Sequence, residues 1–322
     1  MTSGDVSAVL ELLGIRLARL RPDLSVCGSP DRCLERTAAE DAQGNLWVVE
    51  RHHLSEAARK QSVAAAEAHL AAQLPEVRAP LAFAPGRFLA ERDGGAWQVR
   101  PYFAGVALDR PGFAFDGWRG EALAGLLVRF RAASAGLPAP GRDAGAAAPG
   151  PFSLADFVRG LMDTLRDRRR PLFERLHPAA VALERELFPA LAGLPEAFAH
   201  GDFHPLNVVW GPAGINALVD FEFCGPRPET YDAALLVGCV GMEDPRALGA
   251  DLVLRFVGRL GAEAGFSAAG WRSFPALVAG LRFAWLSEWL RRDDREMIDL
   301  EAVYIGLLME RREALARAWG RG

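Results

Sequence analysis

The 322-residue sequence is poor in cysteine and contains one lysine. The four cysteines are scattered and form no CxxC pair, which argues against a disulfide framework and against a zinc site of the usual spacing. Lys60 is the single lysine among 37 basic residues. Any role that requires a long, flexible cation therefore falls to Lys60 or to an arginine.

The sequence also lacks long apolar runs and an excess of positive charge. No apolar stretch approaches the roughly 20 residues that cross a bilayer, and the first residues do not resemble a secretory signal. The formal net charge of −4 argues against a nucleic-acid-binding protein. We therefore expect a cytoplasmic protein with no nucleic-acid or membrane partner, and the sequence does not indicate its oligomeric state.

The chain changes character near residue 105. Short strands are predicted over residues 34–38, 46–51, 87–90 and 97–103, and an alanine-rich helix over residues 55–74. Helical patterns dominate after Gly105, and residues 137–151 are typical of a surface loop or linker. We predict a strand-rich N-terminal lobe over residues 1–104 and a larger helical lobe over residues 105–322.

The most informative segment is His200-Gly-Asp-Phe-His-Pro-Leu-Asn207, followed by two short apolar runs and Asp220. The apolar runs, residues 208–210 and 215–219, flank a Gly/Pro turn and predict a β-hairpin. A hairpin brings the residue before its first strand close to the residue after its second. Asn207 and Asp220 are therefore expected at the same open end, with Asp202 on the loop that enters the hairpin.

These residue types suit phosphoryl transfer. Carboxylate and amide oxygens hold magnesium, while an aspartate can orient and deprotonate an attacking hydroxyl. The spacing His200-x-Asp202-x4-Asn207 is that of protein-kinase catalytic loops. Two simpler interpretations compete: that Asp202 and Asn207 are turn residues, and that His200 and His204 bind zinc from one helix turn. The first leaves Asp220 and the hairpin unexplained, and Gly201 and Pro205 disfavour the second.

The segments HGDFHPLNVVW and VDFEFCGPRPETYDAALL together resemble the aminoglycoside phosphotransferase superfamily, which includes choline kinases and homoserine-kinase-like enzymes. The resemblance implies an α+β, bilobal, protein-kinase-like fold that binds ATP and Mg²⁺. It implies that Asp202 is the catalytic base and that Asn207 and Asp220 are magnesium ligands. His200 is assigned to the catalytic group, packing beneath the loop, and Asp232 is expected to brace the loop backbone.

The same resemblance predicts the nucleotide site. The segment WQVRPYFAG resembles the hinge between the lobes, so Arg100, Tyr102 and Phe103 are assigned to nucleotide binding. Gly28 and Ser29 lie where the family places its phosphate-covering loop.

The family's third-strand lysine position falls on Glu50, where a carboxylate would repel phosphates. Glu67, on the following helix, is expected to pair with a cation, and we predict that this cation is Arg51. Neighbouring strand residues point to opposite faces unless a bulge intervenes, so this pairing requires a bulge. Lys60 shares a helical face with Glu67 and could reach the cleft, but we interpret it as solvent-exposed.

Substrate binding is assigned to His204, Glu222 and Trp285. Glu222 could instead bind metal or cap a turn, His204 could lie at the surface, and Trp285 belongs to an aromatic stripe typical of a core. Homoserine-like, choline-like, sugar and aminoglycoside hydroxyls all remain open as acceptors. Two functions follow: a small-molecule kinase, or a catalytically impaired nucleotide- or metabolite-binding module of the same fold.

Overall fold

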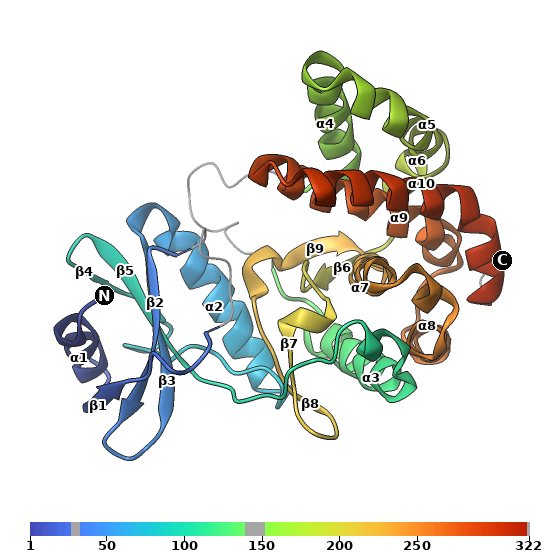
Figure 1. Ribbon diagram of the computed structural model, residues 1–322. Helices are drawn as coiled ribbons and strands as arrows, with labels where there is room; N and C mark the ends of the chain where they lie inside the picture. Colours follow the sequence, from blue (N-terminus) through green and yellow to red (C-terminus); the bar gives the residue numbers. More distant parts are fainter. Residues whose placement is uncertain (27–32, 139–151, 321–322) are drawn as a thin grey trace. The chain divides into compact units, whose positions relative to one another are not determined.

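The structure is a computed structural model that describes residues 1–26, 33–138 and 152–320 (Figure 1). The chain forms two compact units. The first comprises Met1–Ala107 and Asn207–Cys224, with part of the segment that follows residue 135. The second comprises Leu108–Ala135, Pro149–Leu206 and Gly225–Gly322. The segment that carries Asn207 and Asp220 thus joins the N-terminal residues in one unit, although it lies far along the sequence.

The first unit is built on a five-stranded antiparallel sheet of order β1-β2-β3-β5-β4. Its strands are β1 (Leu17–Leu20), β2 (Glu35–Asp41), β3 (Leu46–His53), β4 (Ala90–Arg92) and β5 (Gly95–Pro101). The helices of this unit are α1 (Ser3–Glu11) and α2 (Ala57–Ala71), which Figure 1 shows on opposite sides of the sheet.

Side-chain alternation divides the sheet into an apolar face and a polar face. Val49 of β3 and Val99 of β5 are fully buried in one core cluster with Val6 and Val9 of α1. Their strand neighbours Glu50, Gln98 and Arg100 therefore point to the other face, the side of α2. This alternation decides which charged side chains can meet α2.

The hairpin predicted from the sequence is present in the first unit. Strand β7 (Val208–Trp210) pairs antiparallel with β8 (Ile215–Leu218), and the Val219 amide donates to the Asn207 carbonyl at 3.0 Å. The Leu218 amide also donates to the Glu76 carbonyl at 2.8 Å, which ties the hairpin to the segment after α2.

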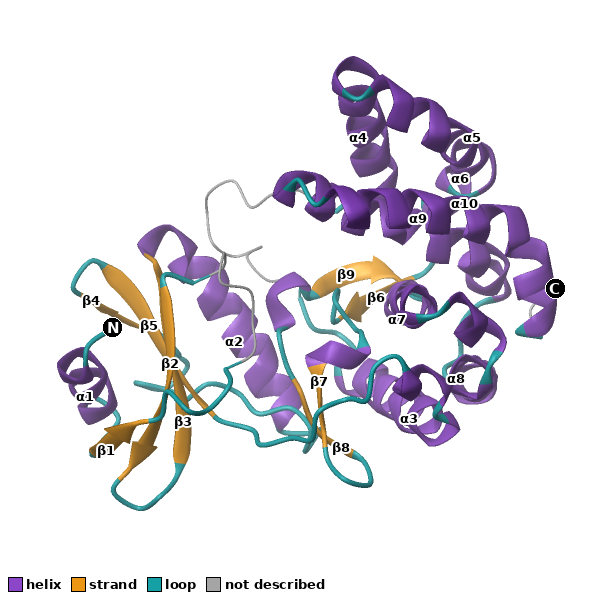
Figure 2. Ribbon diagram, viewed as in Figure 1, coloured by secondary structure: helices purple, strands orange, loops and turns teal. Residues whose placement is uncertain are grey.

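The second unit is mainly helical (Figure 2). Its helices are α3 (Gly117–Ala133), α4 (Leu154–Arg168), α5 (Arg170–Glu186), α6 (Phe188–Leu191), α7 (Tyr231–Glu243), α8 (Asp251–Glu263), α9 (Ala268–Arg292) and α10 (Arg295–Ala318). A two-stranded antiparallel sheet of β6 (Glu196–Ala199) and β9 (Gly225–Pro228) flanks the loop of His200. A buried ion pair joins α9 to α10, with the Arg282 Nε 2.6 Å from a Glu301 carboxylate oxygen.

Several local predictions need correction. The sequence did not predict α1 or β1, and α2 ends at Ala71 rather than residue 74. The strand predicted over residues 87–90 is instead β4, which begins at Ala90. No helix among the described residues is long and apolar enough to span a membrane.

Candidate active site

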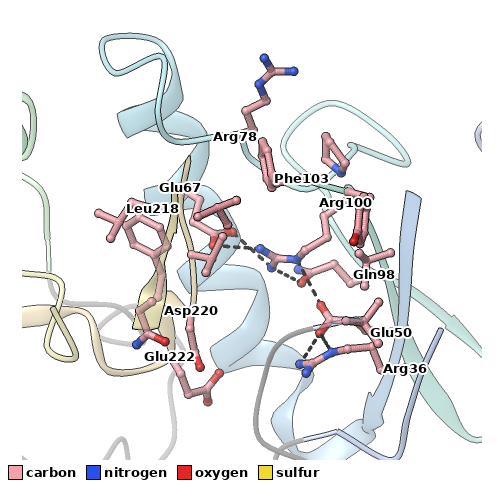
Figure 3. Close-up of a pocket in the computed structure, with 18 of the residues that line it drawn as sticks. Arg36, Glu50, Glu67, Arg78, Gln98, Arg100, Phe103, Leu218, Asp220 and Glu222 are labelled. Atoms are coloured by element: carbon pink, nitrogen blue, oxygen red, sulfur yellow. Dashed lines mark hydrogen bonds and ion pairs between the residues drawn. The ribbon is translucent and has the colours of Figure 1, made fainter. Parts of the chain in front are cut away.

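A pocket lies within the first unit, between the polar face of the sheet, α2 and the β7–β8 hairpin (Figure 3). Its charged lining residues come from five elements or their flanking segments. They are Arg36, Glu50, Lys60, Glu67, Arg78, Arg100, Asp220 and Glu222. Asn207 adds an amide, and Tyr102 and Phe103, two of the predicted nucleotide-binding residues, complete one wall.

Arg100 is the centre of a charge network in this pocket. Its Nε donates to Glu50 Oε2 at 3.2 Å, and its two terminal nitrogens donate to the Glu67 carboxylate at 3.2 and 3.5 Å. A further bond of 2.7 Å reaches the side-chain oxygen of Gln98. Arg36 of β2 binds the other Glu50 oxygen at 2.6 Å. These contacts run from Glu67 through Arg100 to Glu50 and Arg36 (Figure 3).

The pKa values of the two carboxylates in this network shift in opposite directions. Burial alone would raise the pKa of Glu50, but the charges of Arg100 and Arg36 outweigh it and lower the pKa to about 2. Burial raises the pKa of Glu67, and the Glu50 charge raises it further, which together outweigh the opposing charges of Arg100 and Lys60. The two carboxylates in turn raise the pKa of Arg100, against the opposing effect of its burial.

The predicted pairing of Arg51 with Glu67 is wrong. The β2–β3 register runs without a bulge from Glu35↔Arg51 to Glu40↔Leu46, so Arg51 points away from Glu50's face. Arg51 instead pairs with Glu35 at 3.3 Å and lies over the Trp97 ring, 5.5 Å from its centroid. Arg51 is not among the residues that line the pocket.

Lys60, which we interpreted as solvent-exposed, is instead largely buried. Its side chain is 11% exposed, and its Nζ lies 2.5 Å from Glu222 Oε2. Arg59, the preceding residue of α2, binds the other Glu222 oxygen at 2.7 Å and also contacts the Glu222 carbonyl oxygen. Glu222 is therefore held by two cations of one helix.

Asn207 and Asp220 both line the pocket, as the hairpin prediction requires. Asp220 has left-handed backbone angles, φ 64° and ψ 64°, which are uncommon for a residue other than glycine. Such geometry clusters at functional sites, where the surrounding structure maintains it. The amide and carboxylate oxygens of these two residues are donors of the kind that magnesium accepts.

The described residues contain no group of three His, Cys, Asp or Glu side chains placed to hold a metal ion. The oxygen donors still fit Mg²⁺, which usually takes one or two protein carboxylates and fills its other positions with water and phosphate.

The loop after β6, in the second unit, is fixed by Asp232. The Asp232 carboxylate accepts hydrogen bonds from the backbone amides of His200 at 2.7 Å and Gly201 at 2.9 Å. Gly201 has a φ of 83°, which costs a glycine little. The loop backbone is therefore braced as the resemblance implies.

His200 is fully buried beneath this loop. Its ring packs edge-on against Phe130 and Phe203, with centroids 6.4 and 6.2 Å away. Its Nδ1 accepts the Asp202 amide proton at 3.3 Å. His200 thus supports the backbone that carries Asp202.

Asp202 and His204 lie side by side in the second unit. The His204 Nε2 is 3.5 Å from Asp202 Oδ2, and the His204 ring packs edge-on against Trp285 with centroids 5.7 Å apart. The Arg282 guanidinium covers Trp285 at 5.3 Å. The structure thus groups the predicted base with two predicted substrate-binding residues, whereas Glu222 lies in the first unit with α2. Gly28 and Ser29 lie outside the described residues.

The model of the phosphotransferase enzyme family matches residues 36–277. The chain belongs to this family. No curated protein sequence matches the chain significantly.

Solved structures show the same fold for this phosphotransferase family member. An amicoumacin kinase in complex with AMP-PNP, Ca²⁺ and Ami is 14% identical with a TM-score of 0.65, covering 96% of each chain. A GDP complex of aminoglycoside 2'-phosphotransferase-IIIa is 17% identical with a TM-score of 0.63, covering 95% of this chain and 97% of that one. A choline/ethanolamine kinase family protein from Mesorhizobium loti is 19% identical with a TM-score of 0.58, covering 100% and 99%. The α+β bilobal, kinase-like fold expected from the sequence is confirmed.

Sequence reasoning missed part of the lining of the pocket. Arg36 and Gln98 were not predicted, and Arg100 was assigned to the hinge rather than to Glu67. A usable signal was present: Gln98 and Arg100 alternate with the apolar Trp97 and Val99, so both share one face of β5.

Proposed function

We propose that this protein is an ATP-dependent phosphotransferase that transfers the γ-phosphate to a hydroxyl group of a small molecule. The observation that carries the proposal is the pocket of the first unit, where Asn207 and Asp220 present oxygen donors beside the cations Lys60 and Arg100. Family membership and relatives solved with AMP-PNP or GDP support a nucleotide in that pocket.

In this proposal Asp202 is the general base. Its carboxylate orients the acceptor hydroxyl and takes its proton as the oxygen attacks the γ-phosphorus. The bond between the γ-phosphorus and the β–γ bridging oxygen breaks, and ADP leaves with the electron pair. Asp232 and His200 keep the Asp202 backbone in place through the contacts described above.

Asn207 and Asp220 would hold Mg²⁺ in the proposed enzyme. Magnesium neutralises charge on the phosphates and keeps them in line for transfer. Tyr102 and Phe103 provide an aromatic wall of the pocket, on which a purine base can stack. His204 and Trp285, grouped with Asp202, are the residues that we assign to the acceptor.

The proposal is tested by measuring nucleoside diphosphate release from ATP and from GTP with magnesium. The acceptor panel contains homoserine, choline, ethanolamine, simple sugars and aminoglycosides. We expect acceptor-dependent release that falls by at least about 1000-fold in Asp202→Ala and in Asp220→Ala, because each removes a group essential to positioning or charge neutralisation.

Asp93→Asn is the matched control. Asp93 also has a positive φ, 48°, in the first unit, but its side chain is 68% exposed and does not line the pocket. Its activity should equal that of the wild type. Undiminished turnover in Asp220→Ala would reject the metal assignment.

A second function is favoured by Glu50, which occupies the expected lysine position. A binding module of the same fold would bind nucleotide without transferring phosphate. Calorimetric nucleotide binding together with a flat acceptor panel supports this second function, whereas phosphate transfer to any acceptor in the panel excludes it.

A further inference from the structure

Lys60 is a largely buried cation that lines the pocket. It lines the pocket together with Val63 and Glu67, at spacings of three and four residues on one face of α2. A side chain that is only 11% exposed is unusual for lysine, which normally keeps its ammonium in water. Its burial in a pocket therefore calls for a ligand or a partner of opposite charge.

Two of the other cations of the pocket bind its carboxylates, and the third is exposed. Arg100 directs four of its five N–H groups at Glu50, Glu67 and Gln98. Arg36 binds Glu50 with two nitrogens at 2.6 Å. Arg78 is exposed and lies over the Phe103 ring, and Figure 3 shows its guanidinium pointing away from Asp220.

Lys60 differs from Arg100 in how many of its N–H donors are used. An ammonium has three N–H donors, and within the described part of the chain Lys60 has one hydrogen-bond partner, Glu222. Glu222 is also paired with Arg59, whose guanidinium lies 3.8 Å from the Glu56 carboxylate as well. Two N–H donors of the Lys60 ammonium remain for an anionic ligand.

Glu222 also fixes the position of the Lys60 ammonium. It follows Asp220 by two residues, and both line the same pocket. The ion pair thus ties the Lys60 ammonium to the segment that presents the proposed metal ligand. An ammonium beside a magnesium ligand is suited to the oxygens of a nucleotide's phosphates.

We propose that Lys60, carried by α2 and held by Glu222, binds the phosphates of the nucleotide in place of the strand residue at position 50. The assignment rests on the proposed function, since it takes a nucleotide as the ligand of the pocket. Glu222 is then a positioning residue for Lys60 rather than a contact for the acceptor.

The test compares Lys60→Met with Arg59→Met by isothermal titration calorimetry. The ligands are magnesium with whichever of ATP and GTP the wild type binds, the corresponding diphosphate, and the nucleoside. Arg59→Met is matched because it removes a cation from the same helix and the same Glu222 carboxylate, yet Arg59 does not line the pocket.

Lys60→Met should raise the triphosphate Kd by about 10- to 100-fold, which is the range for losing a charge-assisted hydrogen bond. The effect should shrink for the diphosphate and vanish for the nucleoside. Arg59→Met should change every Kd by less than about threefold, and Lys60→Arg should retain most of the triphosphate affinity. Circular dichroism melting of each variant checks that the unit remains folded.

Wild-type triphosphate affinity in Lys60→Met overturns the assignment and leaves the proposed function intact. An equal loss of triphosphate and nucleoside binding also overturns it, because that pattern indicates a structural role for the pair. A wild-type protein that binds neither ATP nor GTP overturns the proposed function as well.

Discussion

At the scale of single residues, the cation that pairs with Glu67 lies on β5, and a carboxylate lies on β3 where a cation was expected. The position at which the resemblance predicts a lysine holds Glu50, and the arginine that meets Glu67 comes from β5. The register pairs Glu50 with Gln98 and Val48 with Arg100, so Arg100 is a diagonal neighbour of Glu50. Such diagonal distances lie within reach of a long side chain. An ion pair between α2 and the sheet is therefore still formed, with its cation on β5 instead of β3.

Arg100→Met should strongly destabilise the first unit. It leaves Glu50 with one arginine and Glu67 without its cation, and their side chains are only 7% and 2% exposed. Removing one partner of a buried ion pair costs about 3–5 kcal/mol in free energy of unfolding. Urea denaturation followed by fluorescence measures the change.

Arg92→Met is the control for Arg100→Met. Arg92 pairs with Asp93 at the surface, with side-chain exposures of 43% and 68%, so its removal should cost less than about 1 kcal/mol. Equal stabilities of the two variants would contradict a structural role for the Arg100 network.

At the scale of elements, helix α3 meets α8 at a glycine. A Cβ added to Gly120 would lie 2.1 Å from the Leu252 carbonyl oxygen, a backbone atom that cannot rotate away. Gly160 of α4 is exposed, and its added Cβ would meet nothing within 4 Å. The two helical glycines therefore differ in what surrounds them and not in their helical setting.

Gly120→Ala should lower the free energy of unfolding by at least about 1–3 kcal/mol, because overpacking forces the two helices apart. Gly160→Ala should raise it by about 0.5–1 kcal/mol, the gain in helix propensity. Urea denaturation of both variants provides the comparison, and a neutral Gly120→Ala would show that the α3–α8 contact yields easily.

Several elements could be predicted from the sequence, whereas contacts between residues far apart in the chain could not. Strand β3, helix α2 and the β7–β8 hairpin were predicted, because their apolar periodicity and turn residues are local signals. The partner of Glu67 was not, since Arg100 is 33 residues away and its side of the sheet depends on the β3–β5 register. The burial of Lys60 likewise depends on Glu222, 162 residues further along the chain.

At the scale of the whole molecule, the buried network should make stability depend on pH. The pKa of Glu50 is about 2 in the folded protein and close to its ordinary value of 4.5 when unfolded. Its stabilising contribution is therefore complete above pH 4.5 and is lost as the pH falls towards 2.

Glu50→Gln should accordingly be less stable than the wild type at pH 7, with the difference shrinking at pH 3. Urea denaturation at both pH values measures this change. Glu174→Gln serves as the control, because Glu174 belongs to a surface pair with Arg170 and should have little effect at either pH. A Glu50→Gln deficit that stays constant from pH 7 to pH 3 would contradict the assigned ionisation.

The solitary lysine gives this protein an unusual chemical handle. Apart from the α-amino group, the sequence contains a single primary amine, that of Lys60, which lines the pocket and pairs with Glu222. An acylating reagent can therefore add one covalent mark to a side-chain amine, and intact mass spectrometry can count it without digestion. Protection of that amine from acylation by an added compound would report occupancy of the pocket in a mixture, without a turnover assay.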